Sequence, residues 1–386
     1  MAGRGRQWVD STVKRNGEPG RAIEFVALRR GASLTRWAMQ QRQIIKFPGS
    51  VTTHVEKPSD VGKKARHEPP QVSVDDACAD LRAMKVRGGS RVARYAVQAL
   101  RDFAKDSPGA RNPAGYWDSM LKAGERLKSA RPTAFALTNG VNYVLNAGAK
   151  SLESGGPVEE TRNAAVNAAD DFIAHTFDAV RTIGEIGARR IKNGDTVITH
   201  SDSEAAMSVM KKAHDIGKGI RVYCTETRPN YQGHRTAAAL AAYGIDTTLI
   251  CDSACRVMMG DVDKAIVGCD AISGNGALVS KIGVSQMAML AQEARVNFIV
   301  AAETYKVDFS TLSGRLIDVE QRDPTEIAAR EWMEHNPKVK FSNYVFDFTP
   351  PEYIDIYVTE KGVMPPAGIF TLMQELRDQY ASRSFV

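Results

Sequence analysis

Residues 193–230 read NGDTVITHSDSEAAMSVMKKAHDIGKGIRVYCTETRPN, and this stretch decides the fold of the chain. Its short apolar runs at 196–200 and 220–225 predict two strands, and the segment 203–216 between them predicts a helix. A strand, a helix and a second strand in this order form a right-handed crossover between parallel strands. The pattern therefore predicts an α/β domain.

The same alternation continues beyond residue 230. Apolar runs at 247–251, 264–268 and 298–302 predict three more strands, and residues 236–243 and 286–294 predict further helices. Strands of about five residues that alternate with helices are typical of a doubly wound sheet. We expect a Rossmann-like, mainly parallel sheet.

The chain before residue 193 has a different pattern. Residues 73–192 are mostly helical in their apolar spacing, and a Gly-rich stretch at 151–157 predicts a loop between helices. A segment rich in Pro, Lys and Ser, residues 56–71, precedes these helices. We predict three parts: a basic N-terminal extension (1–66), a helical N-terminal domain (67–192) and the Rossmann-like domain (193–386).

Composition limits the class of protein. Of the 386 residues, 43% are hydrophobic and 25% are charged, as in an ordinary soluble globular protein. No apolar run reaches the roughly 18 residues that cross a bilayer, and the N-terminus shows no secretory segment. We therefore expect a cytoplasmic protein without membrane contact.

The cysteines and the N-terminal charge are weaker signals. The five cysteines are scattered, and no nearby Cys or His pair completes a zinc site with Cys251 and Cys255, so we expect buried thiols and no metal. Residues 1–66 hold 14 Lys or Arg against 5 Asp or Glu, but no nucleic-acid module. We expect a solvated or subunit-contacting extension, with nucleic-acid contact as the alternative.

Polar side chains gather where the predicted strands end. In a doubly wound sheet, ligands bind beyond the carboxyl ends of the strands. The polar clusters at these ends are His200–Ser203, Thr225–Arg228, Asp252, Gly268–Asp270 and Glu303–Lys306. Ser203 is a predicted N-cap, and the helix N-terminus behind it is a natural anion site.

Three of these residues suggest chemistry, each with an alternative. Arg228 suits bidentate contact with a phosphate or carboxylate, or a structural pair with Glu226. Asp270, beside glycines, is a candidate acid with a raised pKa, or it caps the following turn. Lys306 ends another strand and is otherwise a solvated lysine. The glycines match neither GxGxxG nor the P-loop spacing, so nucleotide binding is not indicated.

A series of motifs in one order resembles a known family. These motifs are THSDSEAA, TETRPNYQGHRTA, DSAC, VGCDAISGNGALVSKIG, AAETYK, RDPTE and FDFTPPEYIDIYVTEKGVMPP. They resemble the archaeal ribose-1,5-bisphosphate isomerases, within the family of methylthioribose-1-phosphate isomerases and the alpha, beta and delta subunits of initiation factor 2B. VRGGS (86–90) and RPTA (131–134) are similar to its N-terminal substrate-contact motifs. The resemblance covers residues 74–375.

The resemblance implies a helical domain before a Rossmann-like domain and a homo-oligomer, either a dimer or a hexamer. It implies conversion of ribose 1,5-bisphosphate to ribulose 1,5-bisphosphate in nucleotide salvage, without a metal or other cofactor. Asp270 takes the position of the catalytic Asp, and Ser201 that of the catalytic Cys. The implied substrate-binding residues are Arg87, Gly88, Gly89, Arg131, Arg228, Asn275, Ser280, Lys281 and Lys306.

Two positions depart from the isomerase pattern. Ser201 replaces Cys, and Ser280 replaces the usual Asn before Lys281. A serine hydroxyl needs a neighbouring base where a thiol ionises more readily, and His200 or Asp202 are the candidates. The alternatives are therefore an active isomerase, a regulatory subunit of the initiation factor 2B type that binds a sugar phosphate without turnover, and a methylthioribose-1-phosphate-type isomerase.

Overall fold

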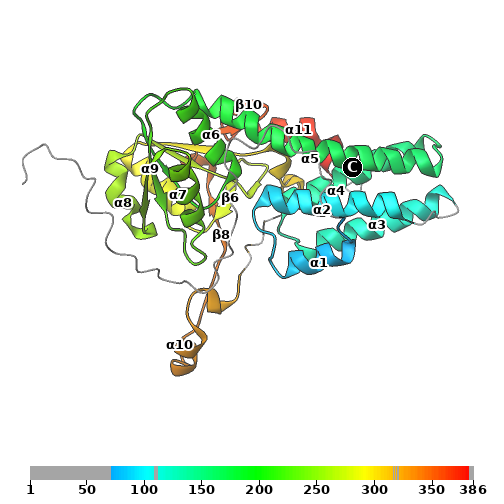
Figure 1. The fold of residues 1–386 in the computed structure, drawn as a ribbon, viewed down its shortest axis with the longest axis horizontal. Coiled ribbons are helices and arrows are strands. Elements are labelled where there is room, and N and C mark those ends of the chain that lie inside the picture. Colours follow the sequence, from blue (N-terminus) through cyan, green and yellow to red (C-terminus); the bar gives the residue numbers. More distant parts are fainter. Residues whose placement is uncertain (1–70, 108–111, 316, 318, 320, 382–386) are drawn as a thin grey trace, which may run out of the picture. The chain divides into compact units, whose positions relative to one another are not determined.

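A computed structural model describes residues 71–107, 112–315, 317, 319 and 321–381, which belong to one compact unit. The predicted basic extension, 1–66, lies outside them. Figure 1 shows a group of helices followed along the chain by a sheet with helices on both faces. The first five helices are α1 (Val74–Arg82), α2 (Gly89–Asp106), α3 (Pro113–Ala130), α4 (Phe135–Glu153) and α5 (Val158–Ala188).

Local capping explains where the first helices begin. The Ser73 hydroxyl accepts a hydrogen bond from Asp76 N at 3.0 Å at the start of α1. Asn112 Oδ1 accepts one from Gly115 N at 2.7 Å, and Pro113 fills the first turn of α3, where no backbone donor is needed. The 31-residue helix α5 carries Glu159 and Glu160 in its first turn. Their negative charges interact favourably with the positive end of the helix dipole.

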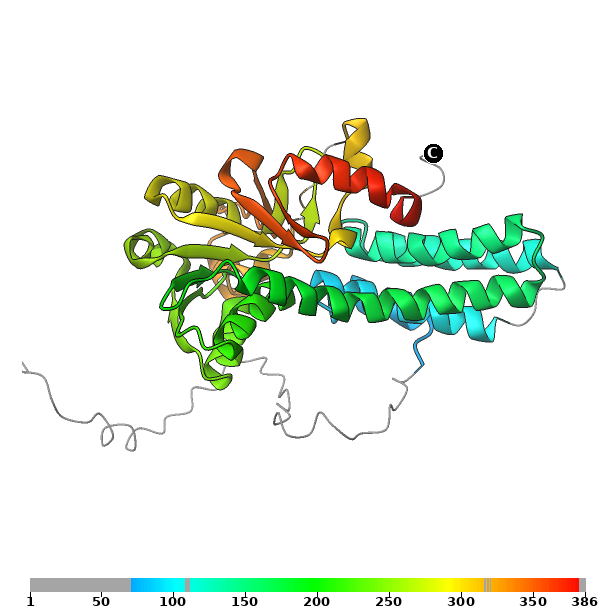
Figure 2. The ribbon, with the colours of Figure 1, turned by 90° about the horizontal axis from the view of Figure 1, so that it is seen from above.

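Helix α5 joins the helical part to the sheet. Figure 2 shows it as the long green helix that lies beside α4 and continues to the helices on the sheet. It meets α6 (Glu204–Asp215) through two glycines: a Cβ on Gly184 would lie 2.2 Å from Ser208 Oγ, and one on Gly187 would lie 2.5 Å from a Val209 methyl. The two helices are therefore packed closely enough to hold the two parts together.

The central sheet confirms the predicted fold class. Its seven strands are β1 (Thr196–Thr199), β2 (Arg221–Thr225), β3 (Asp246–Ile250), β4 (Lys264–Val267), β7 (Asn297–Ala301), β9 (Ile356–Thr359) and β10 (Gly362–Met364). They lie in the order β10-β9-β7-β4-β1-β2-β3, and all neighbours are parallel except β10 and β9. The chain winds outward in opposite directions from β1 and β4. This pair is the topological switch point, where α/β proteins bind ligands.

The remaining elements complete the layers. The helices of the sheet part are α6, α7 (Gln232–Ala242), α8 (Cys255–Met258), α9 (Val284–Ala294), α10 (Arg330–His335) and α11 (Gly368–Tyr380). A second, antiparallel sheet in the order β5-β6-β8 consists of β5 (Ala271–Ile272), β6 (Leu278–Lys281) and β8 (Phe346–Thr349). The sequence did not predict this sheet, although β6 carries Ser280 and Lys281 to the switch point.

The core continues from the helices into the sheet. Phe172 of α5 meets Tyr305 edge-on with ring centroids 5.3 Å apart, and both rings are fully buried. Asn139 of α4 donates hydrogen bonds to the Tyr305 and Val307 carbonyls, at 2.8 and 2.7 Å. These contacts fix the segment after β7, which carries Lys306.

Two predictions from composition can be compared with the structure. Four cysteines are buried free thiols, as predicted, whereas Cys251 is exposed. Over the described part of the chain, no helix has both the length and the apolar character needed to cross a membrane.

Candidate active site

A cavity of about 110 Å³ opens at the switch point of the sheet. The N-terminal end of α2 and the chain following β1 and β4 contribute to its lining. Nine of the predicted site residues line it: Arg87, Gly88, Gly89, Arg131, Ser201, Asp270, Ser280, Lys281 and Lys306. Residues more than 200 positions apart in the sequence thus share one cavity.

Asp270 follows β4 and lies among positive charges. Its backbone N–H donates to Val279 O at 3.0 Å, which fixes the residue against β6. Part of its surface faces the cavity, yet the surrounding protein desolvates the carboxyl and raises its pKa, while Lys306, Lys281 and Arg131 oppose the rise. The carboxyl therefore keeps its proton to a higher pH than a free aspartic acid, as a general acid requires.

Lys281 and Lys306 are both about 5% exposed. Lys306 Nζ donates to Cys269 O at 2.8 Å and pairs with Glu303 at 2.7 Å, so Lys306 is not a solvated lysine. Burial lowers the pKa of Lys281. Within the described residues its ammonium makes no hydrogen bond and no ion pair within 4.0 Å. A buried cation that lines a cavity and has no partner among the described residues is suited to an anionic ligand.

The start of α2 adds backbone donors to these cations. Gly88 has φ 91°, a conformation that glycine adopts without strain, and α2 begins at the next residue. A Cβ on Gly89 would lie 3.8 Å from both Asp270 Oδ1 and Lys306 Nζ, so glycine leaves room between the helix and these groups. First-turn N–H groups lack intrahelical acceptors and attract anions.

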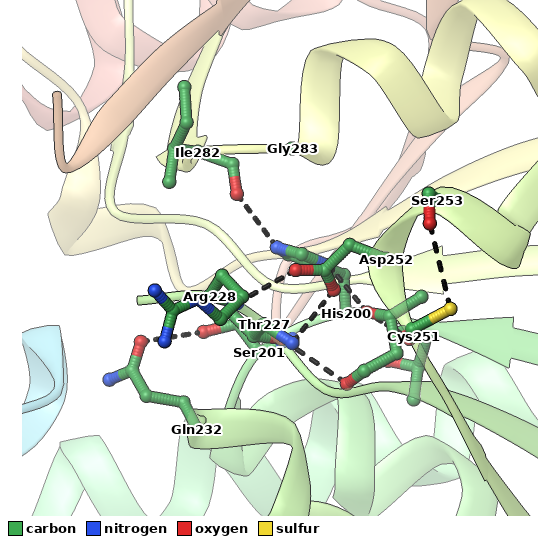
Figure 3. Close-up of polar contacts among 12 residues, drawn as sticks. His200, Ser201, Thr227, Arg228, Gln232, Cys251, Asp252, Ser253, Ile282 and Gly283 are labelled. Atoms are coloured by element: carbon green, nitrogen blue, oxygen red, sulfur yellow. Dashed lines mark hydrogen bonds and ion pairs between the residues drawn. The ribbon is translucent and has the colours of Figure 1, made fainter. Parts of the chain in front are cut away.

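Ser201 lies at the end of β1 in a left-handed conformation, with φ 69°. Its backbone N–H donates to Thr227 Oγ1 at 2.9 Å, and the Thr236 hydroxyl donates to Ser201 O at 2.7 Å. Its own hydroxyl donates to Gln232 Oε1 at 3.2 Å (Figure 3). The partner of the hydroxyl is thus an amide, which cannot serve as a strong base.

The two candidate bases beside Ser201 have other partners. His200 Nε2 contacts Ile282 O at 2.8 Å, and Nδ1 contacts Thr225 Oγ1 at 2.6 Å. Burial lowers the pKa of His200, so a neutral ring donates from Nε2 and accepts at Nδ1. Asp202 lies 3.1 Å from Arg235 and 3.7 Å from Arg91. Both side chains hold the loop in place.

Asp252 fixes the loop that supports Ser201. Its two carboxylate oxygens accept hydrogen bonds from Thr227 N at 2.8 Å and Arg228 N at 2.7 Å. Figure 3 shows the carboxylate of Asp252 between these backbone groups and His200, whose Nδ1 is 4.0 Å away. Asp252 therefore positions Thr227, which in turn holds Ser201.

The structure does not bring two predicted residues to the cavity lining. Arg228 donates to Tyr231 Oη at 2.7 Å and to Ile327 O at 3.1 Å, and its guanidinium stacks over the Tyr231 ring. Arg228 therefore links its own loop to the segment around Ile327. It does not form the structural pair with Glu226 that was the alternative. Asn275 is exposed and accepts a hydrogen bond from Ala277 N at 3.1 Å within its own turn.

Sequence reasoning missed Glu326, the last residue of the RDPTE motif (322–326), which lines the cavity. Its Oε2 accepts from Asn230 at 3.2 Å and Asn343 at 3.4 Å, and Oε1 lies 3.9 Å from Arg87. Arg322 of the same motif also lines the cavity. The motif was visible, but no local pattern indicated that its side chains return to the switch point.

The chain is similar to several known proteins. The model of the Initiation factor 2 subunit family matches residues 85–366. The ribose 1,5-bisphosphate isomerase of Methanocaldococcus jannaschii is 45% identical over 295 residues, covering 76% of this chain and 92% of the relative. The methylthioribose-1-phosphate isomerase of Acetivibrio thermocellus is 34% identical, covering 76% and 88%. Among solved structures, the translation initiation factor eIF-2B of Pyrococcus horikoshii OT3 superposes with a TM-score of 0.64 at 26% identity, covering 76% and 97%.

Proposed function

The chain belongs to the Initiation factor 2 subunit family, and we propose that it is an isomerase converting α-D-ribose 1,5-bisphosphate into D-ribulose 1,5-bisphosphate. The observation that carries the proposal is Asp270, a carboxyl of raised pKa among cations at the switch point. The 45% identity to an isomerase of this name supports the substrate. Nucleotide salvage is the process that we propose it serves.

The cavity offers two kinds of phosphate partner. Arg87, Arg131 and Lys281 supply positive side chains, and the first turn of α2 supplies backbone donors. A pentose with a phosphate at each end carries negative charge on both sides of the ring. We propose that these groups hold the two phosphates and leave the ring oxygen near Asp270.

The proposed reaction needs one acid and one base. Asp270 donates its proton to the ring oxygen as the bond from this oxygen to C1 breaks, which leaves a hydroxyl at C4. A base removes the proton from C2, and the electron pair forms the C1–C2 double bond of an enol phosphate. The C2 hydroxyl then loses its proton while C1 gains one. The product is a 2-ketose with both phosphates retained, and no atoms are gained or lost.

The reaction also needs a base, and the candidate for this role is Ser201. Ser201 occupies the position, but its hydroxyl donates to the Gln232 amide, and the candidate bases next to it are engaged elsewhere. This observation favours a second function: binding of a sugar phosphate without turnover. In that case the same cations and Asp270 hold the ligand, and the protein acts as a sensor or regulatory subunit.

One experiment separates the two functions. The purified protein is incubated with ribose 1,5-bisphosphate, and the product is followed by ³¹P and ¹³C NMR, with methylthioribose 1-phosphate as a comparison substrate. Isomerase function predicts ribulose 1,5-bisphosphate, and Asp270→Asn lowers the rate by roughly 10²–10⁴. Asp261→Asn, an exposed aspartate, is the matched control. Tight binding by calorimetry without turnover of either substrate supports the sensor instead.

We also propose a homo-oligomer, which the family resemblance supports. Light scattering coupled to size-exclusion chromatography measures the mass of the assembly. A monomer at micromolar concentration would contradict this part of the proposal.

A further inference from the structure

A buried acid lies beside the proposed acid catalyst, and the mechanism above does not use it. Glu303 follows β7 and is 1% exposed. Lys306 lies three residues later, at the end of the 3₁₀ helix Thr304–Lys306, and is 5% exposed. A buried carboxylate is costly unless it has partners, so its contacts show what the position requires.

Each oxygen of Glu303 has its own partner. Oε1 accepts a hydrogen bond from the Ser90 hydroxyl of α2 at 2.7 Å, and Tyr305 Oη lies 3.4 Å away. Oε2 lies 2.7 Å from Lys306 Nζ. Lys306 Nζ also donates to Cys269 O at 2.8 Å, so the ammonium has both an ion-pair partner and a hydrogen-bond acceptor. Both the carboxylate and the ammonium are therefore held in fixed positions.

Lys306 lies near Asp270 but is not paired with it. Lys306 Nζ and Asp270 Oδ1 are each 3.8 Å from the point where a Gly89 Cβ would lie. Among the described residues, the ion pairs of Lys306 within 4.0 Å include Glu303 and not Asp270. The charged groups that act on Asp270 come from three segments and are Lys306, Lys281, Arg131 and Glu303.

We propose that Glu303 is a positioning residue that binds Lys306 Nζ and so prevents this ammonium from forming an ion pair with Asp270. The inference deepens the proposed function, because it matters most if Asp270 is the acid. A lysine within about 4–6 Å lowers the pKa of a carboxyl by roughly 1–3 units. Without Glu303, Lys306 would turn to Asp270 and lower the pKa of its carboxyl. With Glu303, Lys306 keeps its charge for the ligand while the pKa of Asp270 stays raised.

The protonation of Asp270 is measured without any substrate. Infrared pH-difference spectra of the full chain follow the carbonyl stretch of the protonated carboxyl, assigned by its loss in Asp270→Asn. Glu303→Gln is expected to lower the pKa of Asp270 by at least about one unit. Lys306→Met is expected to raise it, and the double variant is expected to match Lys306→Met. An unchanged pKa in Glu303→Gln, or a double variant that still shows the fall, overturns the proposal.

Two further variants test specificity. Glu360→Gln removes another buried carboxylate, which accepts a hydrogen bond from Thr304 N at 3.1 Å but does not contact Lys306. It is expected to leave the Asp270 pKa unchanged, and an equal fall would show that the effect is not specific to Glu303. If Glu303→Gln does not fold, Glu303→Asp keeps the charge and draws it back by one methylene. A smaller fall is then expected, and no fall overturns the proposal.

This test and the proposed function fail separately. If the wild-type protein turns over no aldose 1-phosphate, the proposed function fails, while the infrared titration still decides the role of Glu303. If turnover is observed, the high-pH limb of kcat/KM moves to lower pH in Glu303→Gln by the same amount as the infrared pKa. A purely structural role would lower the rate without moving the limb.

Discussion

The hydroxyl of Ser201 donates to the side-chain amide of Gln232 at 3.2 Å, at the position where the family resemblance implies a catalytic thiol. The backbone of Ser201 is held in its left-handed conformation by Thr227 and Thr236, so the side chain is positioned as a functional group would be. The position therefore holds a poorly ionisable hydroxyl on a firmly held backbone.

Replacing this hydroxyl by a thiol should restore a base. We expect Ser201→Cys to raise kcat with ribose 1,5-bisphosphate by at least about tenfold, because a thiol ionises near neutral pH and a serine hydroxyl does not. Ser201→Ala is the matched control and should fall below wild type if the hydroxyl contributes at all. A cysteine variant no faster than wild type, in a protein that Asp270→Asn still inactivates, would show that another group is the base.

The pH dependence of turnover should report Asp270. Burial raises the pKa of this carboxyl, so the protonated form, which the proposed mechanism requires, persists to a higher pH than in a free aspartic acid. We expect kcat/KM to fall about tenfold per pH unit above this pKa. The fall should be absent from the residual rate of Asp270→Asn. If the same limb remains in that variant, it belongs to another group.

The stability of the fold should depend on pH through His200. Its folded-state pKa is lowered by burial, so below about pH 6.5 the unfolded chain binds a proton that the native protein does not. Stability is therefore fully present above pH 6.5 and is lost as the pH falls towards the lowered pKa. We expect the free energy of unfolding, measured with urea, to fall between pH 7.5 and 5.5, roughly the titration range of His. The fall should be smaller in His200→Gln than in wild type.

His335→Gln serves as the control for this measurement, because His335 is exposed at the end of α10. It should follow the wild-type pH dependence. Equal slopes for wild type and His200→Gln would show that His200 does not titrate differently in the folded and unfolded states.

The close packing of α5 on α6 should make Gly184 intolerant of a side chain. A Cβ there would lie 2.2 Å from Ser208 Oγ and 3.0 Å from the Ser208 carbonyl oxygen, so the helices must separate. We expect Gly184→Ala to lower the free energy of unfolding by about 1–3 kcal/mol. Gly260→Ala is the control, since nothing lies within 4 Å of its Cβ. Equal stability of both variants would contradict the close approach.

The parallel sheet was predictable and the small sheet was not. Buried parallel strands such as β1 and β4 are continuous apolar runs, and their observed bounds lie within one residue of the predicted ones. Strands β5 and β6 have two and four residues and are separated by a glycine turn, which leaves no period to detect. The third strand of this sheet, β8, pairs with β6 but begins 65 residues beyond its end.

The candidate site divides in the same way. Asp270 and Ser201 meet at one cavity because parallel strands end at the same edge of the sheet, which the strand pattern implied. The contact of Arg228 with Ile327 and the pairing of Glu303 with Lys306 depend on side-chain direction. No spacing in the sequence contains that information.

Lys281 and Arg228 were both predicted to bind substrate, but their contacts indicate that substituting them should have different effects. Lys281 lines the cavity, is buried, and has no ion pair within the described residues, so a ligand phosphate would be its main partner. We expect Lys281→Met to raise the KM for ribose 1,5-bisphosphate at least about tenfold, the cost of a lost charge-assisted hydrogen bond. Arg228→Met should raise it only a few-fold, because Arg228 holds the Ile327 segment and does not line the cavity. Initial rates for both variants, with thermal unfolding as the check on folding, decide the matter. A larger effect at Arg228 than at Lys281 would mean that the loop of Arg228 closes on the ligand and that the arginine binds phosphate directly.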